Sequence, residues 1–103
     1  AVRSYKVEIL LAAWQDIDKI SDFYMKMSGA VSAQRITDQI LDTLEKLGDF
    51  PYMGAQHPDP ELMRREYRKV ICGDYVCVYK VIGPSVYVYR VVNGRTDYPK
   101  LLK

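Results

Sequence analysis

Residues 67–92 read YRKVICGDYVCVYKVIGPSVYVYRVV and are rich in β-branched and aromatic residues. Two turn signals divide this stretch, Gly73-Asp74, which fits a two-residue hairpin turn, and Gly83-Pro84-Ser85. Strongly β-forming runs bounded by such turns are typical of consecutive antiparallel strands. The pattern therefore predicts a three-stranded meander made of Tyr67–Cys72, Tyr75–Ile82 and Val86–Val92.

The first part of the chain predicts one strand followed by a helix. Residues 4–11 alternate between the two faces of a strand, with Tyr5, Val7 and Ile9 on the same face. From Ala12 onward the apolar residues recur every three or four positions, as on an amphipathic helix. They are Trp14, Ile17, Ile20, Tyr24 and Met27, and Gly29 is the expected end of the helix.

A second amphipathic helix is expected next, capped by Ser32 and ended by Gly48. Its apolar face comprises Ile36, Ile40, Leu41, Leu44 and Leu47. The short link around Gly29 makes the two helices an antiparallel hairpin. Residues 50–64 contain several prolines and a glycine, so we expect a loop there.

The predicted order is β-α-α-β-β-β, a single α+β domain spanning residues 1–103. We expect the helical hairpin to pack on one face of a small, mainly antiparallel sheet. The other face is then left to solvent or to a binding partner.

The composition excludes several classes of protein. A chain of 103 residues with 49% hydrophobic residues can form one core, which excludes large multidomain enzymes and repeat arrays. The longest uncharged apolar run, residues 9–14, is far shorter than the roughly 20 residues of a membrane span. Because Arg3, Lys6 and Glu8 interrupt any apolar leader, we expect no signal peptide, no membrane partner and a cytoplasmic protein.

Charge is distributed unevenly along the chain. Residues 1–63 hold 6 Lys/Arg and 10 Asp/Glu, a net charge of 6 − 10 = −4, whereas residues 64–103 hold 9 and 3, a net charge of +6. Six of the nine tyrosines also lie in this second part. Such a basic, aromatic half is typical of a surface that contacts phosphate or an acidic partner. Alternatively, the two halves neutralise each other across the fold.

The nucleophilic and metal-binding residue types offer little chemistry. In the predicted hairpin Cys72 and Cys77 do not face each other, so we interpret both as buried, unpaired thiols. His57 is the only histidine, and its proline-flanked loop predicts an exposed side chain. No catalytic triad, glycine-rich phosphate loop or metal-ligand spacing is present, so we expect neither a metal nor a cofactor.

Arginine, lysine and tyrosine remain as candidates for a site on the sheet. Arginine can hold a phosphate with two hydrogen bonds, and tyrosine can transfer a proton or stack on a base. The best candidates are Arg95 and Tyr98, which follow the last strand. Arg90 could instead pair with an acidic residue of a helix, and Tyr87 and Tyr89 could simply pack in the sheet.

The order of elements and several motifs together resemble the RelE/ParE superfamily of type II toxins. The resemblance covers essentially the whole chain, although no single motif is diagnostic. It is carried by the opening strand and residues 12–17, by residues 47–54, and by residues 67–71, 74–79 and 86–98, with Leu101-Leu102 trailing.

The resemblance implies a toxin of a toxin-antitoxin (plasmid stabilisation or addiction) system that is neutralised by an antitoxin. One branch of the superfamily cleaves mRNA in the ribosomal A site, and another inhibits DNA gyrase. Carried over from the cleaving branch, Arg68, Arg95 and Tyr98 would be catalytic, and Lys69, Lys80 and Arg90 would bind RNA phosphates. Cleavage would be independent of metal and would leave a 2′,3′-cyclic phosphate.

Two departures from the cleaving branch leave the target open. Val76 stands where that branch has an arginine, and the chain has no C-terminal histidine. The hypotheses are therefore a ribosome-dependent mRNA endoribonuclease, which is ranked first, a gyrase inhibitor without catalysis, and a fold that only binds its antitoxin. An acidic, partly disordered antitoxin is the expected partner of the basic half, together with ribosome and mRNA, or gyrase.

Overall fold

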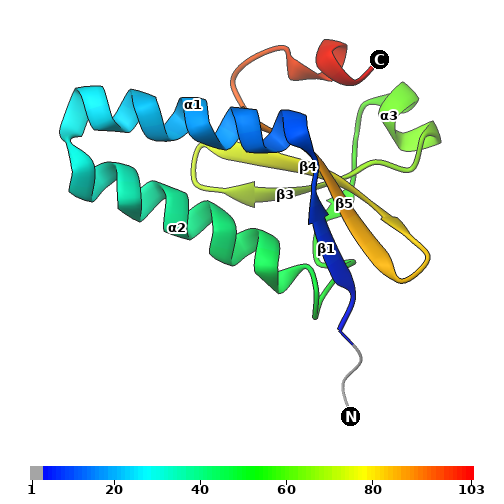
Figure 1. Cartoon of the computed structure of the whole chain (residues 1–103). Helices are drawn as coiled ribbons and strands as arrows, with labels where there is room; N and C mark the ends of the chain where they lie inside the picture. Colours follow the sequence, from blue (N-terminus) through cyan, green and yellow to red (C-terminus); the bar gives the residue numbers. More distant parts are fainter. Residues whose placement is uncertain (1–3) are drawn as a thin grey trace.

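Two long helices lie across one side of a five-stranded sheet, as Figure 1 shows. The computed structural model describes residues 4–103, so Arg3 lies outside it. In chain order the elements are β1 (Lys6–Ile9), α1 (Leu11–Ser28), α2 (Ala30–Lys46), β2 (Ala55–Gln56), α3 (Pro60–Arg64), β3 (Arg68–Cys72), β4 (Tyr75–Ile82), β5 (Ser85–Asn93) and the 3₁₀ helix η1 (Tyr98–Leu102). The predicted α+β class and the β-α-α-β-β-β order of the main elements are confirmed.

The sheet has the strand order β1-β5-β4-β3-β2. The predicted meander of β3, β4 and β5 is antiparallel throughout, with Arg68 opposite Tyr79 and Cys77 opposite Val91. β1 instead runs parallel to β5, with Val7 opposite Val86. The sheet is therefore mixed, and its first strand lies beside its last.

The helical hairpin turns at Gly29, whose φ of 91° lies in the region that favours glycine. The Gly29 amide donates to the carbonyls of Tyr24 and Met25, which ends α1. The expected cap by Ser32 is wrong, because α2 already begins at Ala30 without a side-chain cap. Gly29 reverses the chain in one residue, so no room is left for a separate capping segment.

The helices cover one face of the sheet with apolar side chains. The core between them includes Ala13, Ile17, Ile20, Ile40, Leu44 and Leu47 from the hairpin and Cys77, Tyr79, Val86, Val88 and Val91 from the strands. The predicted apolar stripes of both helices supply this core, except Trp14 and Met27, which are exposed. We call this side of the sheet the helical face.

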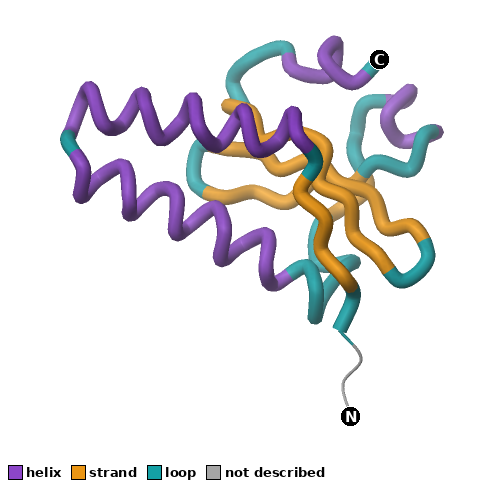
Figure 2. Tube along the Cα trace, in the orientation of Figure 1, coloured by secondary structure: helices purple, strands orange, loops and turns teal. Residues whose placement is uncertain are grey.

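The opposite side, which we call the outer face, is covered as well, contrary to the expectation that it is open. A second core forms there from Leu62, Tyr67, Val76, Val78, Val92 and Tyr98. Leu62 belongs to α3 and Tyr98 to η1, and the Arg65 Nη1 donates to the Leu102 carbonyl at 3.1 Å, which joins these two elements. Figure 2 shows them as short purple turns on a sheet otherwise flanked by the long helices.

Residues 50–64, expected as a loop, contain the two-residue strand β2 and the short helix α3. The Asp59 carboxylate caps α3 by accepting the amides of Glu61 and Leu62 at 3.0 and 3.1 Å. The helix ends at Arg64; beyond it, Glu66 has a left-handed φ of 65° and the Tyr67 amide donates to the Leu62 carbonyl. Polar caps at both ends explain why five residues form a helix here.

None of the helices within residues 4–103 combines the length and apolar character that crossing a bilayer requires.

Candidate functional site

Arg68, a predicted catalytic residue, lies at the start of β3 and is engaged by the segment before β2. Its Nε donates to the Gly54 carbonyl at 3.0 Å and its Nη2 to the Tyr52 carbonyl at 3.4 Å. The guanidinium carbon lies 5.1 Å from the centre of the Tyr52 ring, a cation–π contact. The guanidinium is therefore already bound to two carbonyls and one ring.

Tyr98, the second predicted catalytic residue, is buried in the outer-face core against His57. The Tyr98 Oη and His57 Nε2 are 2.7 Å apart, and the rings meet edge to face. His57 Nδ1 accepts the Asp59 amide at 3.0 Å, so in the neutral imidazole the proton is on Nε2 and is donated to Tyr98. The expectation that His57 is exposed is wrong, since only 2% of its surface is accessible.

Burial shifts both groups of this pair away from acid-base chemistry near neutral pH. Desolvation, followed by the positive charge of Lys69, lowers the pKa of His57. Desolvation and the negative charge of Asp59 raise the pKa of Tyr98. His57 is thus a neutral donor and Tyr98 a protonated phenol, an arrangement that fixes η1 to the segment before α3.

Lys80, a predicted phosphate contact, lies over two aromatic rings on the outer face. Its Nζ is 4.2 Å from the centre of the Tyr67 ring and 5.5 Å from that of Tyr89. The two rings meet edge to face at 5.2 Å. The positive charge of Lys69, the neighbouring candidate on β3, lowers the pKa of His57 in the outer-face core.

Arg90 pairs with a helix carboxylate, which is one of the two interpretations left open by the sequence. Its Nε and Nη2 donate to the two Asp16 oxygens at 2.7 and 2.8 Å. Asp16 also accepts the Val91 amide at 2.9 Å, beyond the end of β1. The carboxylate thus supplies a hydrogen-bond acceptor to β5 at a position that β1, its parallel partner strand, no longer reaches. Its hydrogen bond also raises the pKa of Arg90.

Arg95, the third predicted catalytic residue, is exposed in the link between β5 and η1. Its backbone amide donates to Asn93 Oδ1 at 2.9 Å. Arg68 shares its row of the sheet with Tyr79 and Val88. Arg95 follows the end of β5. That end is about 16 Å from the Arg68 row along the strand, and β5 is about 10 Å from β3 across two strand spacings.

The structure therefore does not bring the three predicted catalytic side chains together. The surface hollow beside Arg68, about 180 Å³, is bordered by Tyr52, Gln56, Glu66 and Val81 and includes neither Arg95 nor Tyr98. Across residues 4–103, no three His, Cys, Asp or Glu side chains gather in a geometry that could hold a metal ion. Cys72 and Cys77 are both buried and unpaired, as predicted.

The sequence did not indicate the His57–Tyr98 pair, whose members are 41 positions apart. The available signal was weak: a lone histidine between prolines and a tyrosine before Pro99. Only the return of the chain along the outer face brings the two residues together.

Comparison with solved structures places the fold among toxin-antitoxin proteins. A chain of the chromosomal ParDE TA system from P. aeruginosa superposes with a TM-score of 0.75 at 18% identity, covering 88% of this chain and 97% of that one. A chain of the toxin-antitoxin complex RelBE2 from Mycobacterium tuberculosis gives 0.68 at 17% identity, covering 93% and 98%. Among curated proteins, no sequence relative matches.

At 17–18% identity, these two likenesses show the fold, which this chain shares with chains of the ParDE and RelBE2 toxin-antitoxin systems. A family model described as "ParE toxin of type II toxin-antitoxin system, parDE" matches residues 7–98, nearly the whole chain. The protein belongs to this ParE toxin family and is the toxin of a type II toxin-antitoxin system.

Proposed function

We propose that this toxin inhibits DNA gyrase by binding to it and does not cut mRNA. The observation that carries the proposal is the separation of Arg68, Arg95 and Tyr98, each of which has its own local surroundings. The match to the ParE family model supports the same conclusion, since the gyrase-inhibiting branch of the superfamily works without catalysis. Inhibition by binding needs a complementary surface and no convergent reactive groups.

Cleavage at a 2′-hydroxyl places stricter demands on geometry. A base must lie within hydrogen-bond distance of the hydroxyl, and cations must contact the same phosphate. Here the Arg68 fork donates to the carbonyls of Tyr52 and Gly54, and the Tyr98 hydroxyl is buried against His57. Neither group is free to contact a phosphate bound at Arg95.

One observation favours the second candidate, cleavage of mRNA on the ribosome. Lys80, Tyr67 and Tyr89 form a basic, aromatic cluster on the outer face, a composition found in proteins that bind single-stranded RNA. Both tyrosine rings pack edge to face, however, and Tyr67 is largely buried. The cluster offers little free ring surface on which a base could stack.

The same proposal includes an antitoxin as the neutralising partner. Both solved neighbours come from toxin-antitoxin systems. The net charge of +6 over residues 64–103, calculated from 9 basic and 3 acidic residues, favours an acidic antitoxin. A partly disordered segment that folds on binding would suit this role.

Two assays with the purified toxin test the proposal. Equimolar toxin is expected to abolish supercoiling of relaxed plasmid by gyrase, and toeprinting of translating ribosomes is expected to show intact mRNA. Addition of the antitoxin should restore supercoiling. Cuts in the A site that disappear with Arg95→Ala, together with unaffected supercoiling, would overturn it.

A further inference from the structure

The segment between α2 and β2 exposes large apolar side chains from a fixed backbone. Phe50, Tyr52 and Met53 have 64%, 61% and 42% of their surfaces accessible, although they follow one another within four positions. We call residues 50–54 the target loop. Exposed aromatic and methionine side chains in one cluster are characteristic of protein interfaces.

The backbone of the target loop is held by a buried tyrosine. Tyr79, which has no accessible surface, donates its hydroxyl to the Pro51 carbonyl at 2.8 Å. The same oxygen accepts the Gly54 amide at 3.0 Å. A Cβ atom on Gly54 would collide with the Lys69 carbonyl oxygen and lie 2.7 Å from the Tyr79 hydroxyl, so this approach requires glycine.

Arg68 holds the target loop from the neighbouring strand. Arg68 and Tyr79 are directly opposite each other in the β3–β4 register, so their side chains reach the same segment. The guanidinium donates to Tyr52 and Gly54 carbonyls and contacts the Tyr52 ring. Four hydrogen bonds to one cross-strand pair therefore order the target loop, while its apolar side chains remain exposed. Because the loop is already ordered, binding a partner through it costs less conformational entropy.

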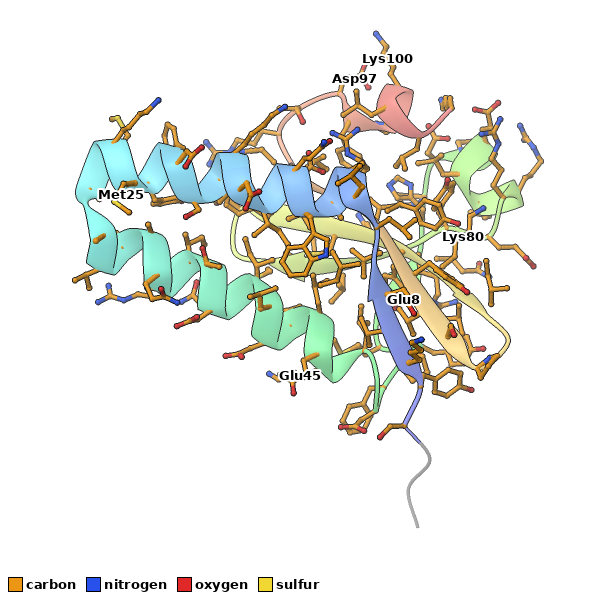
Figure 3. The ribbon with its side chains drawn as sticks, in the orientation of Figure 1. Glu8, Met25, Glu45, Lys80, Asp97 and Lys100 are labelled. Atoms are coloured by element: carbon orange, nitrogen blue, oxygen red, sulfur yellow. The ribbon has the colours of Figure 1, made fainter. Side chains whose placement is uncertain are left out.

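The charges beside the target loop indicate the kind of partner. Asp42, Glu45 and Asp49 border one surface hollow with Lys46, immediately before Phe50 in the chain. Figure 3 shows Glu45 at the end of α2, where the chain turns toward the sheet. With three carboxylates and one lysine, this border is net negative and complements the basic surface of an enzyme that binds DNA.

We infer that the target loop, with its acidic border, is the surface that docks on the toxin's protein target, and that Arg68 and Tyr79 are positioning residues for it. Under the proposed function, on which this inference rests, the target is gyrase. The apolar side chains would enter the interface and the carboxylates would contact its basic rim. Arg68 then acts through the loop and not on a phosphate.

The first test replaces the three exposed side chains together, Phe50→Ser, Tyr52→Ser and Met53→Ser. Loss of even one hot-spot side chain weakens an interface by about 30-fold, so at least that increase is expected in the toxin concentration that half-inhibits supercoiling. Met25→Ser, Met27→Ser and Val31→Ser form the matched control, because these exposed residues flank the Gly29 turn at the other end of the hairpin, where Figure 3 labels Met25. Equal effects of both triple variants would overturn the inference.

The second test separates positioning from catalysis. Tyr79→Phe removes both hydroxyl contacts but leaves the Arg68 guanidinium in place, and Arg68→Ala does the reverse. Both variants are expected to weaken inhibition by about tenfold, to accelerate amide exchange at Gly54, and to add little to the triple loop variant. Full inhibition by Tyr79→Phe beside inactive Arg68→Ala would overturn the positioning role. Circular dichroism and thermal denaturation verify that each variant is folded.

Growth arrest distinguishes failure of the inference from failure of the proposed function. If wild-type toxin arrests growth without affecting supercoiling, the proposed target is wrong, and loss of arrest in the loop variant still supports a docking role. Loop variants that arrest growth normally would overturn the docking role whatever the target. The same holds if they lose only antitoxin binding, or if they change only the oligomeric state measured by light scattering.

Discussion

The helical face and the outer face of the sheet are buried by different means. On the helical face, two helices of 18 and 17 residues contribute periodic apolar stripes that pack on the strands. On the outer face, α3 and η1 have five residues each and depend on polar contacts. Those contacts include the His57–Tyr98 hydrogen bond and the 3.1 Å ion pair between Lys103 and Asp59.

This difference separates a cooperative core from a locally held cover. Helices of five residues have almost no intrinsic stability, so α3 and η1 exist only while their side chains are packed and capped. On the helical face, buried side chains join the two long helices to β3, β4 and β5, and these contacts must break in global unfolding. We expect the outer cover to open at lower free energy than the helical face.

The largest expected effect comes from truncating one buried leucine on each face of the sheet. Leu44 and Leu62 are both almost completely buried, on the helical and outer face respectively. Leu44→Ala is expected to lower the free energy of unfolding by about 4 kcal/mol, and Leu62→Ala by about 2 kcal/mol because the short α3 can collapse into the cavity. Urea denaturation measures both values. Equal losses would show that the two faces form one equally rigid core.

The next effect concerns the junction of α1 with β5. Asp16→Ala leaves the partly buried Arg90 guanidinium and the Val91 amide without their acceptor, so a loss of about 3 kcal/mol is expected. Asp16→Asn retains an oxygen for the Val91 amide and should lose less. If thermal denaturation gives equal losses for the two variants, the charge and not the amide contact dominates.

The outer face alone should respond to mild acid. The folded protein lowers the pKa of His57 by burial and by the charge of Lys69, whereas an unfolded chain has a value of about 6.5. As the pH is lowered below about 6.5, the unfolded state therefore binds more protons than the folded state. The free energy of unfolding falls until the pH reaches the pKa of His57 in the folded protein. Stability is at its full value above about pH 6.5.

Urea denaturation at pH 7.5 and 5.5 measures this loss, with His57→Gln as the control. In this variant, the free energy of unfolding should differ much less between pH 7.5 and 5.5 than it does in the wild-type protein. Asp59, whose pKa is lowered chiefly by the Leu62 amide, loses its contribution only below its ordinary value of 3.8 and does not interfere. An unchanged pH dependence in His57→Gln would assign the effect to other groups.

The smallest expected effect is a stabilisation of the outer face. Glu66 has a φ of 65°, a left-handed conformation that costs a non-glycine residue about 1 to 2 kcal/mol. Glu66→Gly relieves this strain but increases the entropy of the unfolded chain, so a net gain of about 0.5 kcal/mol is expected. Glu66→Ala is the control, because alanine keeps the strain. A gain of equal size in that variant would point to the lost charge instead.

The elements that cover the helical face could be predicted from the sequence, but those that cover the outer face could not. The stripes through Ile17 and Ile40 and the turns at Gly73 and Gly83 are local signals, and the structure confirms the elements they predict. The cover of the outer face has no such period, because α3 and η1 are each about one turn long. Proline-rich composition at these positions is equally typical of a loop.

The candidate site was predictable by residue type but not by arrangement. Arg90 had two possible partners, and only the position of α1 over the β5 edge selects Asp16. Arg68 was predicted to be catalytic from the resemblance to the cleaving branch, yet its carbonyl acceptors lie 14 and 16 positions earlier in the chain. Contacts that depend on how the chain returns to itself have no local sequence signal.

The parallel pairing of β1 with β5 bears on when the toxin can assemble during synthesis. Lys6–Ile9 must wait for Ser85–Val88, so the edge of the sheet closes only after most of the chain has been translated. Closing so long a loop is entropically costly and slows folding. A nascent or prematurely terminated chain that lacks residues 85–88 has no partner for β1. A chain that ends before residue 85 therefore cannot form the edge of the sheet that joins its first strand to its last.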